Sequence, residues 1–255
     1  MTWFSVETIE LVLPFIAIGF AAQLIDGALG MAFGLINSTL LITVMGVPPA
    51  LASASVHAVE TFTTAASGIS HVAHRNVDWR LFRRLVVPGV IGGILGAYVL
   101  SSVDASIARP FVMAYLAMIG LYLLYRASRG AIEPRTPRVI EPLGLIGGFL
   151  DAAGGGGWGP VVTSNLLVQG SNPRQTIGTV NTSEFFLTAT ISATFIAKMG
   201  FAAFTVQTAG LLIGGLLAAP LGGVLAKRVP ARPLMTMVGT LLTLTSAWSV
   251  YAALS

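Results

Sequence analysis

Long apolar runs separated by short polar loops make up nearly the whole chain. The runs lie at residues 7–27, 31–46, 49–73, 81–102, 107–127, 142–153, 157–169, 175–197, 204–226 and 233–253. An apolar stretch of about 18 residues or more is long enough to span the hydrocarbon core of a bilayer as a helix. The pattern therefore predicts an all-α polytopic membrane protein. Composition agrees, since 55% of the residues are hydrophobic and 9% are charged, against about 25% charged in a typical soluble domain.

The charges and the absent residue types narrow the function further. The net charge is +4, but arginine and lysine lie in short loops without a basic face, so nucleic-acid binding is not expected. The chain has no cysteine, which excludes thiolate metal sites and thiol redox chemistry. The sequence contains no HExxH or GxSxG motif and no cluster of histidines. We therefore expect neither an enzyme nor a bound cofactor or metal.

The two halves of the chain repeat each other. An offset of 125 residues pairs Asp26 with Asp151 and Gly34 with Gly159. An offset of 124 pairs further polar positions, namely Ser55 with Thr179, His57 with Asn181 and Glu60 with Glu184. Because polar residues rarely coincide in this way by chance, we infer an internal duplication. It divides the chain into an N-terminal membrane repeat at 1–127, a cytoplasmic linker at 128–141 and a C-terminal membrane repeat at 142–255.

The basic loops predict how the repeats are oriented. Arginine and lysine gather at 75–84, 126–138 and 227–232, and the positive-inside rule places all three loops in the cytoplasm. The stretch 142–169 must then enter the membrane and return, and its roughly 27 residues suit two half-helices that meet at a turn. Five segments per repeat predict inverted repeats with both termini outside. Inverted repeats with broken helices are typical of secondary transporters that bind substrate near the bilayer midplane.

Two glycine-containing turns are the predicted binding site. They read DGALGMAFG at 26–34 and DAAGGGGWG at 151–159, and in an inverted pair their tips would approach each other. Free N–H groups and the positive end of a helix dipole after each turn favour an anion. The candidate substrate-binding residues are Gly30, Gly34, Gly154, Gly155, Gly156, Gly157, Trp158, Gly159, Ser55, His57, Thr179, Asn181 and Gln23. Alternatively, the glycines only allow close helix packing, and Asp26 and Asp151 bind the backbone of their own turns.

Buried carboxylates are the candidates for ion coupling. Glu60 and Glu184 follow His57 and Asn181 by three residues, so each shares a helix face with its neighbour. Carboxylates inside a membrane are costly, and a proton relay or cation coupling through Glu60, Glu184 or His57 would explain them. The alternatives are that the carboxylates cap hairpin N–H groups, and that His57 and Asn181 only join helices.

Both motif pairs resemble those of the TauE/SafE family of sulfite exporters, also called the four-toluene-sulfonate uptake family. The pairs are AQLIDGALGMAFG with VPPALASASVHAVETFTTAASGISH, and GFLDAAGGGGWGP with NPRQTIGTVNTSEFF. Gly154 to Gly157, Gly159 and Pro160 match the family's glycine-rich turn. In the first half Gly30 and Gly34 match, whereas Leu29, Met31 and Ala32 depart from its usual glycines.

The resemblance implies transport of sulfite, thiosulfate or related organosulfonates across the bacterial inner membrane. A secondary transporter working by alternating access is the expected mechanism, and a passive anion channel is the alternative. The expected partners are a small anionic substrate and the lipid bilayer, and the sequence leaves room for a homo-oligomer.

Overall fold

A computed structural model describes residues 6–29, 31–129, 137–225 and 231–254, and within these ranges the chain is helical without any strand. The predicted all-α class is thus confirmed. The elements in chain order are α1 (Val6–Leu29), α2 (Phe33–Thr43), α3 (Pro49–Ala73), α4 (Trp79–Ser102), α5 (Ala105–Ser128), α6 (Glu141–Gly154), the π-helix η1 (Trp158–Thr163), α7 (Ser164–Val168), α8 (Pro173–Met199), the 3-10 helix η2 (Gly200–Ala203), α9 (Val206–Leu225) and α10 (Ala231–Leu254). Part of the predicted linker, 130–136, lies outside the described residues.

Local sequence explains where the long helices begin. α3 and α8 start with Pro49 and Pro173, and proline suits a first helical position because its missing N–H would have no partner there. The Asp78 carboxylate accepts the N–H groups of Arg80 and Leu81 at the start of α4, which satisfies two of the free donors of a helix end. These caps fix the ends of the helices that pass the predicted site.

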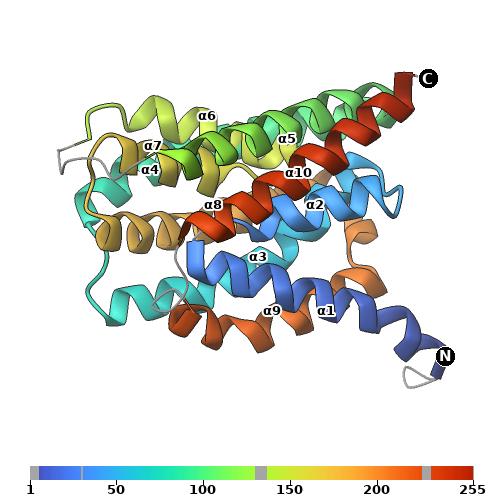
Figure 1. The fold of residues 1–255 in the computed structure, drawn as a ribbon, viewed down its shortest axis with the longest axis horizontal. Coiled ribbons are helices and arrows are strands. Elements are labelled where there is room, and N and C mark those ends of the chain that lie inside the picture. Colours follow the sequence, from blue (N-terminus) through green and yellow to red (C-terminus); the bar gives the residue numbers. More distant parts are fainter. Residues whose placement is uncertain (1–5, 30, 130–136, 226–230, 255) are drawn as a thin grey trace.

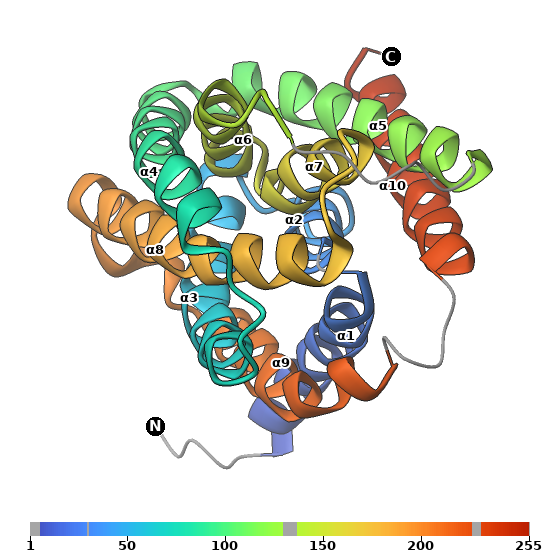
Figure 2. The same ribbon diagram turned by 90° about the vertical axis from the view of Figure 1, so that its left-hand side faces the viewer.

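Helix pairing follows the predicted duplication. Helix α3 packs on α8, α5 on α10, α1 on α9 and α4 on α6. Figures 1 and 2 show α3 and α8 among the other helices. If α1, α3, α4 and α5 are exchanged for α6, α8, α9 and α10, every one of these pairs maps onto a pair. At the α3–α8 contact, Thr64 Oγ1 lies 3.4 Å from Thr188 Oγ1, so a residue meets its own counterpart.

Glycines let the outer helix pairs pack at close range. A Cβ built on Gly92 or Gly96 of α4 would overlap the carbonyl groups of Leu145 and Phe149 on α6, and one on Gly214 of α9 would overlap that of Ile16 on α1. Small residues at such crossings are how membrane helices bring their backbones together. These glycines therefore lie at the interfaces of the helix pairs α4–α6 and α1–α9.

Two hairpins enter the molecule from opposite ends. In Figure 1 the α1–α2 hairpin opens toward the end where both termini lie, and the α6–α7 hairpin opens toward the other end. Within the described residues, three helices are long and apolar enough to cross a membrane, at Trp79–Ser102, Ala105–Ser128 and Gln175–Ala203. Shorter apolar helices, Val12–Asp26, Phe33–Thr43 and Val206–Ala219, accompany them. The protein is therefore built as a membrane protein.

Candidate functional site

Both predicted turns are held by an aspartate in the same way. Asp26 Oδ1 accepts the N–H groups of Ala32 at 2.7 Å and Phe33 at 3.2 Å. Asp151 Oδ1 accepts those of Gly157 at 2.7 Å and Trp158 at 2.9 Å. The partners stand six and seven residues after the aspartate in each case. The reading that each aspartate binds its own turn is confirmed, and the equivalence of the two turns extends to their hydrogen bonds.

This arrangement corrects the expectation of free N–H groups at the turns. Besides the donors bound by Asp26 and Asp151 Oδ1, the N–H groups of Gly155 and Gly156 donate to the Asp151 carbonyl oxygen. A buried backbone donor is rarely left without a partner, and here the protein supplies one. The dipole of the following helix remains, but an anion would have to compete with a carboxylate for most of these donors.

The second turn requires glycine for conformation and for space. Gly155 has a φ of 70° and Gly156 a φ of 147°, values that residues with a Cβ rarely adopt. A Cβ on Gly154 or Gly157 would overlap the Tyr115 ring, and the Tyr115 hydroxyl donates to the Gly156 carbonyl at 3.2 Å. Helix α5 therefore forms one wall of this turn.

The two turns touch each other, as predicted for a pair of hairpin tips. The Ser38 hydroxyl on α2 donates to the Gly155 carbonyl. A Cβ built on Gly34 would lie 3.1 Å from Gly156 Cα and 3.3 Å from Gly155 O. The irregular backbone of each hairpin is thus covered by protein, which is the condition for such backbone at membrane depth.

His57 joins the first half of the chain to the second turn. Its Nε2 lies 3.1 Å from Asp151 Oδ2, and its Nδ1 lies 2.7 Å from the Ser53 carbonyl oxygen. The Ser53 hydroxyl in turn donates to Ala152 O at 2.7 Å. The His57 side chain is fully buried, so this pair of acid and base is shielded from solvent. This bond joins α3 to α6, and the aspartate that it holds is the one that binds the second turn.

The repeat counterpart of His57 is bonded differently. The Asn181 side chain donates to Ile177 O at 3.0 Å and accepts from the Ser67 hydroxyl at 3.4 Å. Both partners lie on the long helices α8 and α3. His57 on α3 therefore bonds to the aspartate of a turn, whereas Asn181 bonds only to groups on α3 and α8 among the described residues.

Glu60 lies at the contact of the two turns. Glu60 is 6% exposed. A Cβ built on Gly34 would lie 2.9 Å from Glu60 Oε1, so this oxygen lies against the first turn. Its second oxygen, Oε2, is buried without a hydrogen-bond partner among the described residues. Glu184, its counterpart on α8, is half-buried. A buried acceptor without a partner is costly, which marks Glu60 as a position where a ligand or proton would be stabilising.

The other predicted residues are distributed around this centre. Trp158 is fully buried and its Nε1 donates to Val180 O at 3.2 Å. Gln23 is buried with Oε1 unpartnered within the described part of the chain, and Gly159 is buried. The Ser55 hydroxyl donates to Ala203 O at 3.0 Å and the Thr179 hydroxyl accepts from Asp78 N at 2.9 Å, so each hydroxyl ties one of the helices α3 and α8 to the segment that follows the other. Gly30 lies outside the described residues.

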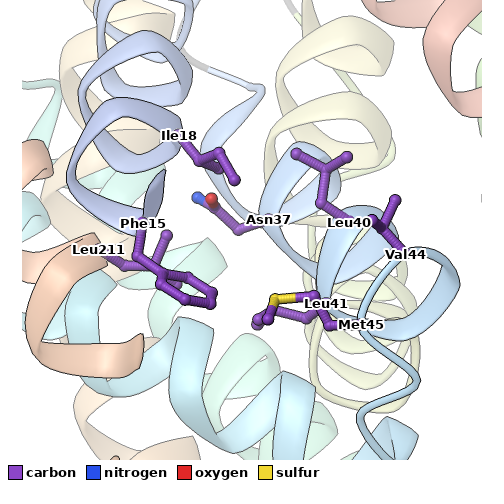
Figure 3. Close-up of a pocket in the computed structure, with 8 residues that line it drawn as sticks. All are labelled: Phe15, Ile18, Asn37, Leu40, Leu41, Val44, Met45 and Leu211. Carbon is purple, nitrogen blue, oxygen red and sulfur yellow. The ribbon is translucent and has the colours of Figure 1, made fainter. Parts of the chain in front are cut away.

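A small hollow beside α1 and α2 does not extend the site. Figure 3 shows Asn37 among apolar side chains that include Phe15, Ile18 and Leu211. The hollow measures about 40 Å³, which holds only a few molecules of the size of water. Asn37 Nδ2 donates to Phe33 O at 2.9 Å. The lining offers an anion no charged group, so the turns remain the better candidate.

Two residues of this centre were not among the predicted ones, Ser53 and Tyr115. Ser53 lies one helical turn before His57, and that spacing is a signal that sequence alone offers. Tyr115 lies in an apolar run on α5 like any interfacial aromatic residue, and nothing in that run points to the glycine turn. Within the described residues, no three histidine, aspartate or glutamate side chains are grouped so that they could hold a metal ion.

Comparison with known proteins finds a family and a curated relative that this chain resembles. The family model described as "Sulfite exporter TauE/SafE" matches residues 15–248. The "Probable membrane transporter protein YtnM" of Bacillus subtilis (strain 168) is 42% identical over 242 residues, which cover 91% of this chain and 80% of that protein. No solved structure matches the chain.

Proposed function

This chain belongs to the TauE/SafE sulfite exporter family of membrane transporters, and we propose that it is a secondary transporter of small sulfur oxyanions across the bacterial inner membrane. Sulfite, thiosulfate and organosulfonates are the proposed substrates. The observation that carries the proposal is the contact of the two aspartate-bound turns, through Ser38 with Gly155 and Gly34 with Gly156. Broken helices that meet inside the protein are where secondary transporters bind their substrates.

The proposed topology is a pair of inverted repeats with both termini outside. Two observations support it: the helix pairs map onto one another when the halves are exchanged, and the two hairpins open toward opposite ends of the molecule in Figure 1. The loop between α3 and α4, which carries Arg75, lies at the end opposite the termini (Figure 1). This end would face the cytoplasm.

Alternating access is supported by two matching corners, one at each end of the α3–α8 pair. The Gly200 corner comprises residues 200–205, and the Arg75 corner comprises residues 74–78. Each contains a residue with positive φ, Gly200 at 66° and Arg75 at 54°, placed 125 residues apart. A Cβ on Gly200 would meet nothing within 4 Å. Glycine is needed there for the backbone conformation itself, which suits a hinge.

The two corners differ in how tightly they are closed. At the Gly200 corner the Ser55 and Thr208 hydroxyls both donate to Ala203 O, and a cavity of about 210 Å³ lies beside it, between Pro48 and Gln207. At the Arg75 corner, Asp78 N donates to Thr179, and Gly178 packs so closely on Asn76 that a Cβ would overlap it. We propose that the corners are gates, with the Gly200 corner the more open one here.

Counterflow tests this function against the channel. Liposomes containing purified protein and loaded with unlabelled sulfite, thiosulfate or an alkanesulfonate should take up the same labelled anion transiently against its gradient. A channel would give uptake that never exceeds equilibrium. If none of these anions exchanges, the transporter proposal is wrong.

The absence of natural cysteine makes the gates directly testable. Oxidation of the pair Ser55→Cys with Ala203→Cys should stop transport, as should oxidation of Asp78→Cys with Thr179→Cys, and reduction should restore it. Each single-cysteine variant serves as the control. Transport that persists with either pair fully cross-linked would contradict the assignment of that corner as a gate.

A further inference from the structure

The segments that form both hairpins and α3 carry no lysine or arginine that could balance the charge of an anion. No lysine or arginine occurs at residues 1–74 or 139–173, the segments that form both hairpins and α3. Among the described residues, the ion pairs are His57 with Asp151 and Arg84 with Glu141, and only the first lies at the turns. The histidines on these segments are His57, His71 and His74. His57 is the one that a described ion pair places at a turn, and there the Asp151 carboxylate already faces it.

Carboxylates instead surround Glu60 from several elements. Asp26 on α1 and Asp151 on α6 are close enough for their charges to act on Glu60. The imidazole of His57, one turn earlier on α3, is the basic group near it. Glu184 on α8 is also close enough for the charge of Glu60 to act on it. The backbone donors of the turns are also occupied, by Asp26 and Asp151. An oxyanion that arrived alone would add its charge to this field, and burying unbalanced charge is costly.

A proton on Glu60 would offset the negative charge that an anion brings to this cluster of carboxylates. Glu60 Oε1 lies against Gly34 of the first turn, next to Gly155 and Gly156 of the second, and Glu60 Oε2 is buried and unpartnered in the described part of the chain. A proton on this carboxyl group removes one negative charge and creates an O–H donor. Both His57 nitrogens already face partners, Asp151 and Ser53, so of His57 and Glu60 it is Glu60 that has an open position for a ligand.

We infer that the substrate binds at the turn contact as a singly charged oxyanion together with one proton, and that the Glu60 side chain carries this proton. The inference rests on the proposed transport function. Glu60 takes a proton from water on one side, its O–H donates to an oxygen of the bound anion, and the proton leaves to water on the other side. One negative and one positive charge cross together, so the cycle is electroneutral for a monoanion.

Methanesulfonate is the sharpest probe, because it carries no proton of its own near neutral pH. Its uptake into liposomes containing the wild-type protein and a lumenal pH dye should acidify the lumen and should not respond to an imposed potassium diffusion potential. Sulfite is run in parallel, with protein-free liposomes to correct for its passive permeation. The Glu60→Gln variant should lose net uptake driven by a pH gradient but retain counterflow, because exchange needs no proton release.

Further variants keep the test decisive. Glu60→Asp retains a carboxyl group and should restore part of the net uptake that Glu60→Gln loses. Glu10→Gln, at an exposed position, should behave as wild type. Three results would overturn the inference. They are wild-type uptake without proton movement, wild-type uptake driven by a sodium gradient, and full pH-driven uptake by the Glu60→Gln variant. Absence of counterflow for every anion would instead refute the transport function itself, so the two failures are distinguishable.

Discussion

The turn after Asp26 and the turn after Asp151 share one hydrogen-bonding scheme but have different surroundings. In each, one carboxylate oxygen accepts two N–H groups six and seven residues later. The second turn also holds two glycines with positive φ, a tyrosine against its backbone and a histidine on the other carboxylate oxygen. The first turn carries Glu60 against Gly34. The shared scheme holds the backbone of both turns, and the two tips differ in the groups packed around them.

The largest predicted difference concerns the two aspartates. Asp151→Ala should reduce the free energy of unfolding by about 3–5 kcal/mol, because it leaves His57 buried without its partner. Asp26→Ala should cost less, about 1–3 kcal/mol, since it frees two backbone donors without breaking a described ion pair. Reversible denaturation in mixed micelles measures both.

A double-mutant cycle of Asp151→Ala with His57→Ala should then show a coupling energy well above that of Asp26→Ala with His57→Ala. Equal losses for the two aspartate variants, together with equal coupling to His57, would mean that the cross-link adds nothing to the second turn.

The glycines give the next largest contrast. Gly156→Ala should lower the free energy of unfolding by about 1–3 kcal/mol through its backbone conformation alone. A steric contribution adds to this, because the new Cβ would lie 2.6 Å from Leu35 N and 2.7 Å from Gly34 C. Gly34→Ala has no such backbone strain, and its Cβ would come closest to the end of the Glu60 side chain, at 2.9 Å, and would lie 3.1 Å from Gly156 Cα. We expect Gly34→Ala to change counterflow more than thermal stability, and Gly156→Ala to lower both. Thermal unfolding and counterflow of the two variants, measured side by side, decide this.

The smallest expected effect is that of Tyr115. Tyr115→Phe removes one hydroxyl bond to Gly156 O and keeps the ring against the turn, so it should cost about 0.6 kcal/mol, the average for a hydrogen bond inside a membrane protein. Tyr115→Ala also removes the wall beside Gly154 and Gly157 and should lower the melting temperature much more. Similar melting temperatures for the two variants would mean that the ring does not support the turn.

Sequence was sufficient for the features that depend on local chemistry. The helix boundaries, the aspartate that binds its own turn and the glycines at helix crossings all follow from residue type and spacing. The partners of His57 and Glu60 did not follow, because residues 57 and 151 meet only through the packing of helices far apart in the chain. The donors at 155–158 show two local rules in conflict, since a helix start predicts free N–H groups and a preceding aspartate predicts bound ones; in the structure Asp151 binds them.

The contact of Thr64 with Thr188 has a consequence for the history of the molecule. If the halves descend from one gene that encoded a half-length subunit, the ancestor was a two-chain assembly in which this threonine faced its own copy across the symmetry axis. In such an assembly every substitution is made twice, and a histidine facing an aspartate would have occurred at both tips. In that case fusion into one chain would have released the constraint and allowed the two halves to carry different residues at this position, His57 and Asn181.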